Sequence, residues 1–171
     1  MIKKTVIINR AVPGSGKTTI TNCIVDTLKQ NNITVAVHST DEYYMVGNKY
    51  IFDIKKLGEY HNKNLENFKN SILDDTDIVI CDNTNIAPWQ TEPYTKLARK
   101  YNYNIIFITL NPRELQKHIE SQRVTTEKPD AHGVCEDVLK MMIDEYFIYD
   151  DLLNKNTIIN KDKHINYKWY K

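Results

Sequence analysis

Residues 11–18 read Ala-Val-Pro-Gly-Ser-Gly-Lys-Thr. They match the phosphate-loop pattern GxxxxGK[ST] except at its first position, where alanine replaces glycine. The amides of residues 14–19 are expected to form an anion nest at a helix N-terminus, because glycine lets the backbone approach phosphate oxygens and the helix dipole favours negative charge. Lys17 is then expected to reach the β- and γ-phosphates of ATP, and the Thr18 hydroxyl to bind Mg²⁺. The predicted ATP-binding residues are Pro13, Gly14, Ser15, Gly16, Lys17, Thr18 and Thr19.

Acidic and amide side chains follow two later apolar runs, where strands are expected to end. A carboxylate at the carboxyl end of a parallel strand faces the ligand crevice. Asp41 is therefore a candidate base for an incoming hydroxyl group, or alternatively the N-cap of the segment after it. Asp82 is a candidate Mg²⁺ ligand opposite Thr18. Asn83 and Asn85 either orient a substrate or shape the turn.

Other nucleotide-hydrolase signatures are missing from the sequence. We find no NKxD-type guanine motif, which a GTPase should carry, and no catalytic glutamate after an acidic strand end, which is typical of motor ATPases. The short chain and these absences favour a small kinase.

A segment at 123–133 has the composition of a loop, since it contains Pro129 and Gly133. Phosphoryl transfer develops negative charge that cations stabilise. Arg123 is the preferred cation, because its guanidinium can bind two oxygens at once, and Lys128 is the second candidate. His132 is expected either to touch the substrate or to cap a helix. The alternative is an ordinary solvated loop.

The elements that position these residues alternate between short β-branched runs and longer amphipathic stretches, which predicts βαβ units. The predicted strands are 5–9, 34–38, 78–81, 105–110 and, more weakly, 157–159. The predicted helices cover 17–31 and 54–73, begin near Pro88 and Pro112, and cover 135–149. The expected fold is α/β, a three-layer doubly wound parallel sheet of the P-loop NTPase class and the small-kinase type, with residues 1–171 forming one domain.

Composition and net charge exclude several other classes of protein. The chain has 171 residues and a formal net charge of +1, which excludes a histone-like polycation or an acidic tail. Three widely spaced cysteines fit neither a disulfide framework nor a CxxC metal site, so a cytoplasmic location is expected. No apolar run approaches the roughly 20 residues of a membrane span. The tail at 160–171 interleaves lysines with aromatic residues, which suits either a nucleic-acid stacking surface or a docked or frayed terminus.

Taken together, the motifs resemble those of P-loop kinases of the polynucleotide-kinase type. The segments that carry the resemblance are 10–19, 39–44, 50–53, 60–62, 82–85, Trp89, 93–94 and 132–134, in that order. The chain is most similar to small AAA-labelled ATP-binding proteins that resemble the P-loop domain of the mammalian ubiquitin-ligase-binding 5′-polynucleotide kinase. It is similar more distantly to bacteriophage polynucleotide kinase.

The resemblance implies an ATP- and Mg²⁺-dependent kinase with Asp41 as general base, acting on the 5′-OH of single-stranded DNA or RNA. It also implies that Tyr44 lies in the substrate site, at the position where the phage enzyme has an arginine for the substrate phosphate. Two alternatives stay open: a kinase of a nucleoside, sugar nucleotide or other small hydroxyl compound, and an ATP-binding adaptor without catalysis.

Overall fold

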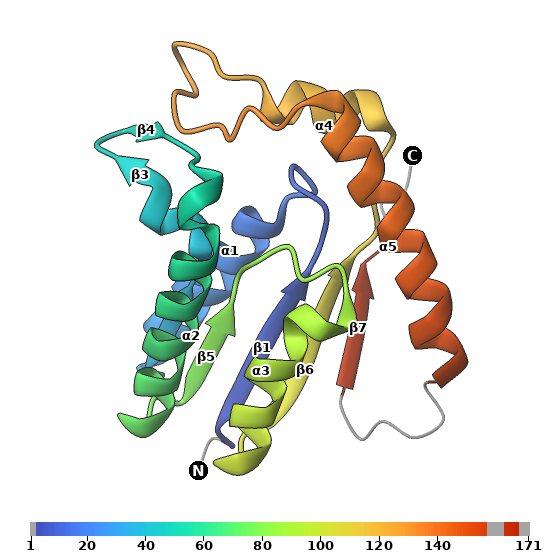
Figure 1. Ribbon diagram of the computed structural model, residues 1–171. Helices are drawn as coiled ribbons and strands as arrows, with labels where there is room; N and C mark the ends of the chain where they lie inside the picture. Colours follow the sequence, from blue (N-terminus) through green and yellow to red (C-terminus); the bar gives the residue numbers. More distant parts are fainter. Residues whose placement is uncertain (1–2, 157–162, 168–171) are drawn as a thin grey trace.

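A parallel sheet forms the centre of the molecule (Figure 1). The computed structural model describes residues 3–156 and 163–167. Its sheet has the strand order β2-β5-β1-β6-β7, and every pairing in it is parallel. The strands are β2 (Val35–His38), β5 (Ile78–Cys81), β1 (Thr5–Arg10), β6 (Asn104–Leu110) and β7 (Lys163–Tyr167).

Helices cover both faces of this sheet because alternate side chains of the central strands point to opposite sides. Val6 and Ile8 of β1 pack against α2 (Leu57–Leu73) and α3 (Pro88–Lys100) on one face. Ile7 packs on the other face, in the cluster that contains the apolar side of α1 (Lys17–Gln30). The predicted three-layer doubly wound fold is confirmed.

The carboxyl edge of the sheet is covered by two further helices, α4 (Leu115–Gln122) and α5 (Glu136–Asn156). They share an apolar cluster with the phosphate loop in which Val12, Leu139 and Tyr146 are fully buried. Arg10 is 2% exposed and ties β1 to α5, since it donates hydrogen bonds to the Tyr146 carbonyl and to Asp150. The segment 123–135 therefore connects two helices that are both packed against the rest of the molecule.

Most predicted elements lie within a few residues of the observed ones, and three differences have local causes. The helix expected from residue 54 begins with a 3₁₀ turn, η2 (Ile54–Lys56), where the Asp53 side chain caps Lys55 N–H. A small hairpin, β3 (Met45–Val46) and β4 (Lys49–Tyr50), was not predicted because its strands have only two residues each. The strand proposed at 157–159 lies outside the described residues, and the fifth strand of the sheet is formed instead by 163–167, within the tail.

No helix in the described part of the chain is long and apolar enough to cross a membrane.

Candidate functional site

The phosphate loop has the backbone that anion binding requires. Gly14 and Gly16 have φ values of +80° and +89°, a region that favours glycine. A Cβ atom on Gly14 would lie 2.0 Å from Ser121 Oγ, so the loop and α4 are packed too closely for a side chain there. Helix α1 begins at Lys17 with no side-chain cap and no acidic residue in its first turn. Its first N–H groups are therefore available to a phosphate.

The alanine that departs from the motif does not disturb the loop. Ala11 is fully buried, is not among the positive-φ residues, and donates its N–H to the Thr84 carbonyl. Ser15 is also fully buried, and its Oγ has no hydrogen-bond partner among the described residues. An anion in the loop would supply the acceptor that this hydroxyl lacks.

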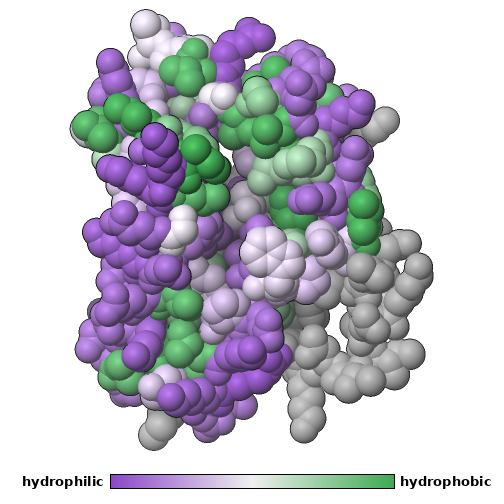
Figure 2. All heavy atoms as spheres, viewed as in Figure 1, coloured by the Kyte–Doolittle hydropathy of each residue, from purple (hydrophilic) through white to green (hydrophobic). Residues whose placement is uncertain are grey.

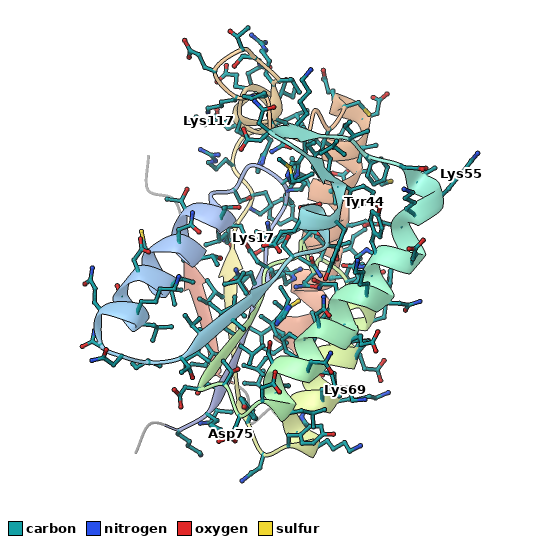
Figure 3. All side chains as sticks on the ribbon, turned by 90° about the vertical axis from the view of Figure 1, so that its left-hand side faces the viewer. Lys17, Tyr44, Lys55, Lys69, Asp75 and Lys117 are labelled. Atoms are coloured by element: carbon teal, nitrogen blue, oxygen red, sulfur yellow. The ribbon has the colours of Figure 1, made fainter. Side chains whose placement is uncertain are left out.

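A cavity of about 560 Å³, here called the phosphate cavity, opens in front of the loop. It brings together most of the residues that the sequence predicted: Pro13, Gly14, Gly16, Lys17, Thr18, Thr19, Asp41, Lys128 and His132. These come from the start of α1, the end of β2 and the 123–135 segment, which are far apart in sequence. Figure 3 shows Lys17 at the carboxyl end of the sheet, with Lys117 marking α4 above it.

Lys17 and Asp82 form a partly buried ion pair beside this cavity. Lys17 Nζ lies 3.7 Å from Asp82 Oδ1, and the side chains are 11% and 6% exposed. Asn9 Nδ2 donates a 2.8 Å hydrogen bond to the same carboxylate oxygen. Burial and the negative charge of Asp82 raise the pKa of Glu42. Acidic and basic side chains therefore lie side by side next to the loop.

Asp41 is held at the mouth of the phosphate cavity by three neighbours. It lies in the 3₁₀ turn η1 (Thr40–Tyr44), which Asn83 fixes by accepting a 2.8 Å hydrogen bond from Thr40 N–H. Tyr50 Oη donates a 3.1 Å hydrogen bond to Asp41 Oδ1, and His132 Nδ1 lies 3.6 Å from Oδ2. The rings of Tyr50 and His132 are stacked, with centroids 4.1 Å apart. Asp41 is nevertheless 35% exposed, so a ligand can reach it.

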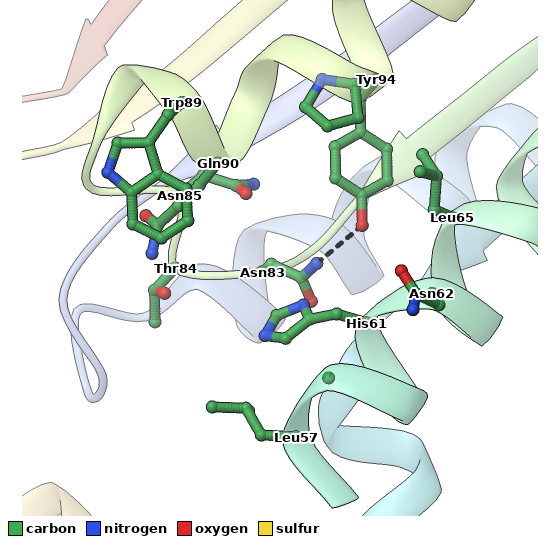
Figure 4. Close-up of a pocket in the computed structure, with 12 residues that line it drawn as sticks. Leu57, His61, Asn62, Leu65, Asn83, Thr84, Asn85, Trp89, Gln90 and Tyr94 are labelled. Carbon is green, nitrogen blue, oxygen red and sulfur yellow. Dashed lines mark hydrogen bonds between the residues drawn. The ribbon is translucent and has the colours of Figure 1, made fainter.

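A second cavity of about 440 Å³ lies between α2 and α3, and we call it the helix cavity. It is lined by both predicted asparagines, Asn83 and Asn85, while Thr84 lines this cavity and the phosphate cavity alike. The Asn83 amide donates to Tyr94 Oη, as Figure 4 shows, and the Asn85 amide donates to the Asn9 carbonyl. Asn85 has a φ of +48°, so it also shapes the turn after β5. Figure 2 shows the surface hollowed between the side of α2 and that of α3.

Tyr44, which was expected in the substrate site, is buried in an aromatic cluster. Tyr44 is 2% exposed and packs against the rings of Tyr50, Phe52 and Tyr60. It lines neither cavity. Burial of its aromatic ring under the hairpin stabilises the apolar packing there.

The structure also places Arg123, the preferred cation for the phosphates, outside the phosphate cavity. Arg123 caps the end of α4, is exposed and does not line the phosphate cavity. Arg113 lines it instead and donates a hydrogen bond to the Gly14 carbonyl. The sequence carried a signal for this, since Asn111-Pro112-Arg113 directly follows β6 at the edge of the sheet where ligands bind.

His118 is a buried support of the phosphate loop that sequence reasoning missed. Its side chain is fully buried on α4, and Nδ1 donates a 2.7 Å hydrogen bond to the Pro13 carbonyl. Nε2 accepts a 2.9 Å hydrogen bond from Arg113 N–H, so the ring must be neutral. Burial lowers the pKa of His118, which favours that neutral form.

Replacing His118 with leucine is expected to destabilise the protein. It leaves the Pro13 carbonyl and the Arg113 N–H buried without partners, and each such group costs about 1–3 kcal/mol. The loss in the free energy of unfolding should shrink as the pH falls below about 6.5, because the native protein then loses the stability of its neutral His118. Urea denaturation at several pH values measures both effects. The exposed neighbour variant Lys117→Ala should behave like the native protein; an equal loss in both variants would contradict this role of His118.

Comparisons with known proteins are consistent with this geometry. The family model "Chromatin associated protein KTI12" matches residues 5–157. Human NEDD4-binding protein 2 is 30% identical over 140 residues, which make up 82% of this chain and 7% of the human protein. The chain thus spans a small part of that relative's length.

Solved structures share the fold at low sequence identity. AvrRxo1-ORF1:-ORF2 with ATP superposes with a TM-score of 0.71 at 12% identity, covering 98% of this chain and 55% of that chain. The Pnkp1/Rnl/Hen1 RNA repair complex gives 0.69 at 12% identity, covering 89% and 47%. Chaetomium thermophilum Kti12 in complex with ADP-AlF3 gives 0.61 at 15% identity, covering 96% and 89%. The fold is therefore that of P-loop kinases and NTPases, and the chain belongs to the KTI12 family.

Proposed function

We propose that this protein is an ATP- and Mg²⁺-dependent kinase that phosphorylates a hydroxyl group, the 5′-OH of a polynucleotide. One observation carries the proposal: the carboxylate of Asp41 lines the same cavity as the phosphate loop. An accessible carboxylate at that point can accept the proton of an acceptor hydroxyl.

The nucleotide would be held by the chain's own groups around the loop. The amides of residues 14–19 and Lys17 would bind the β- and γ-phosphates, as in other phosphate loops. Arg113 and Lys128, which both line the phosphate cavity, supply further positive charge near the transferred group. We propose Arg113 in place of Arg123 as the cation at this point.

The donor set next to the loop fits Mg²⁺. Thr18 offers a hydroxyl and Asp82 a carboxylate, and Mg²⁺ commonly takes one or two such protein ligands together with phosphate oxygens and waters. When bound, the ion neutralises charge on the phosphate oxygens. Among the described residues there is no cluster of three or more His, Cys, Asp or Glu that could hold a metal unaided, which suits an ion that arrives with the nucleotide.

Transfer would then follow from the position of Asp41. The acceptor oxygen attacks the γ-phosphorus, a new O–P bond forms, and the bond to the β-phosphate oxygen breaks, so that ADP leaves. Asp41 accepts the hydroxyl proton. Tyr50 and Asn83 keep the carboxylate at the cavity mouth.

Two observations support a polynucleotide acceptor. The motif resemblance to polynucleotide kinases spans most of the chain, and the Pnkp1 RNA repair complex has the same fold. The net charge of +1 suits a protein that binds the end of a strand rather than a long duplex.

A transfer assay with γ-labelled ATP, Mg²⁺ and a panel of acceptors tests the proposal. The panel consists of 5′-OH DNA, 5′-OH RNA, nucleosides and sugar nucleotides. Label on an oligonucleotide 5′ end is the expected result. Label on a nucleoside or sugar nucleotide alone would replace the polynucleotide by a small acceptor. ATP binding without transfer to any acceptor would favour an ATP-binding adaptor without catalysis. Such an adaptor fits the KTI12 family as well as a kinase does.

A further inference from the structure

The helix cavity and the phosphate cavity are neighbours. Thr84 lines both of them. His61 lines the helix cavity, and its Nδ1 lies 3.2 Å from the hydroxyl of Thr40, the residue before Asp41. A ligand that presents a hydroxyl group to Asp41 can therefore place the rest of its body between α2 and α3.

The walls of the helix cavity suit a flat aromatic ring. Trp89, Pro93 and Tyr94 come from α3, and Leu57 and Leu65 face them from α2 (Figure 4). Trp89 is 67% exposed, although an indole of this size usually gains by burial. Its ring is thus available for stacking on the first turn of α3.

Polar groups are spaced around these apolar walls. Asn62 and His61 lie on the α2 side, and Gln90 lies beside Trp89 (Figure 4). Gln90 Oε1 accepts a hydrogen bond from Ala87 N–H, which fixes the orientation of the Gln90 side-chain amide. The NH₂ group of that side chain takes no part in this bond. A ring that carries both hydrogen-bond donors and acceptors, as a nucleobase does, matches this mixture better than a purely apolar group. The volume of about 440 Å³ also falls within the range of about 300–1,000 Å³ found for small-ligand sites.

We propose that the helix cavity binds the base of the acceptor's 5′-terminal nucleoside, stacked on Trp89, so that its 5′-hydroxyl faces Asp41. This inference rests on the proposed function and adds the acceptor's position and a specificity residue to it. Stacking of a base on an aromatic side chain contributes about 1–3 kcal/mol.

Tryptophan fluorescence tests binding directly. The chain has two tryptophans, Trp89 and Trp169. In the full-length Trp169→Phe variant, Trp89 is the remaining indole. We titrate this variant, with ADP and Mg²⁺ present, with a 5′-OH trinucleotide and with the same trinucleotide lacking its first base. Saturable quenching is expected with the first, and an affinity lower by about 10-fold or more is expected with the second.

Kinetics give the second measurement. Trp89→Ala is expected to raise the KM for the trinucleotide by about 10-fold with little change in kcat, because stacking positions the base away from the reacting atoms. Trp89→Phe should recover part of the loss. Phe147→Ala, which removes a similarly exposed aromatic ring on α5, should change neither constant.

The outcomes separate this inference from the proposed function. Transfer to both trinucleotides with equal KM values would overturn the inference and leave the kinase intact. Base-dependent quenching without transfer would support the binding site and overturn the kinase. Absence of both quenching and transfer would overturn the two together.

Discussion

Replacing Asp41 with asparagine is expected to slow phosphoryl transfer by about 10²–10⁴-fold, the range that a general base contributes. The amide has nearly the same shape, and its oxygen can still accept the hydrogen bond from Tyr50 Oη that holds residue 41 at the cavity mouth. It cannot take up the proton of the acceptor hydroxyl. ATP affinity should be unchanged, because Lys17 and the loop amides do not depend on residue 41. Single-turnover transfer and equilibrium binding of ATP measure the two quantities separately.

Matched controls show whether the effect belongs to this carboxylate. Asp53→Asn changes a nearby carboxylate that caps Lys55 N–H, a role that asparagine also performs. It should leave transfer intact. Tyr50→Phe removes one positioning hydrogen bond and should cost less than Asp41→Asn. Unchanged turnover in Asp41→Asn would remove Asp41 from the chemistry.

Four of the five strands of the sheet were predictable because they are short apolar runs whose pattern is local, whereas β7, Lys-His-Ile-Asn-Tyr, is not such a run. The phosphate loop was predictable for a related reason: the strand before it and the helix after it are adjacent in sequence. Asp41 could be placed near the loop from a topological rule alone, since the carboxyl ends of parallel strands meet at one edge. The roles assigned to these residues stay predictions.

The residues that the structure places away from the predicted site, or that sequence reasoning missed, have environments that depend on distant packing. Tyr44 is close to Asp41 in sequence, yet the hairpin that follows it folds back and buries its ring under Phe52. Arg113 directly follows β6, whereas Arg123 follows α4, and the contact of Arg113 with Gly14 depends on the path of the chain after β6. His118 meets Pro13 across 105 residues of chain, a contact that no local pattern indicates.

Replacing Lys17 with alanine is expected to have two effects, because Lys17 lines the phosphate cavity and forms an ion pair with Asp82. It removes charge-assisted hydrogen bonds to ATP that contribute about 1.5–3 kcal/mol each, so ATP affinity should fall by about 10-fold or more. Transfer should fall further, by about 10²–10³-fold, because the charge on the transferred group grows in the transition state. It also leaves the buried Asp82 carboxylate without its cation, while Asn9 Nδ2 still donates to one of its oxygens, which should lower the free energy of unfolding by about 1–3 kcal/mol.

A double variant distinguishes the two effects. Asp82→Asn in the Lys17→Ala background removes the unpaired buried charge, so the free energy of unfolding should recover while transfer stays low. Lys29→Ala, an exposed lysine in the last turn of the same helix, is the control for the loss of a positive charge from α1 and should alter neither. If ATP binds equally well to Lys17→Ala and to the native protein, Lys17 does not contact the phosphates. If affinity falls and stability recovers as expected, one lysine holds both the nucleotide and the acidic residue proposed to bind its metal.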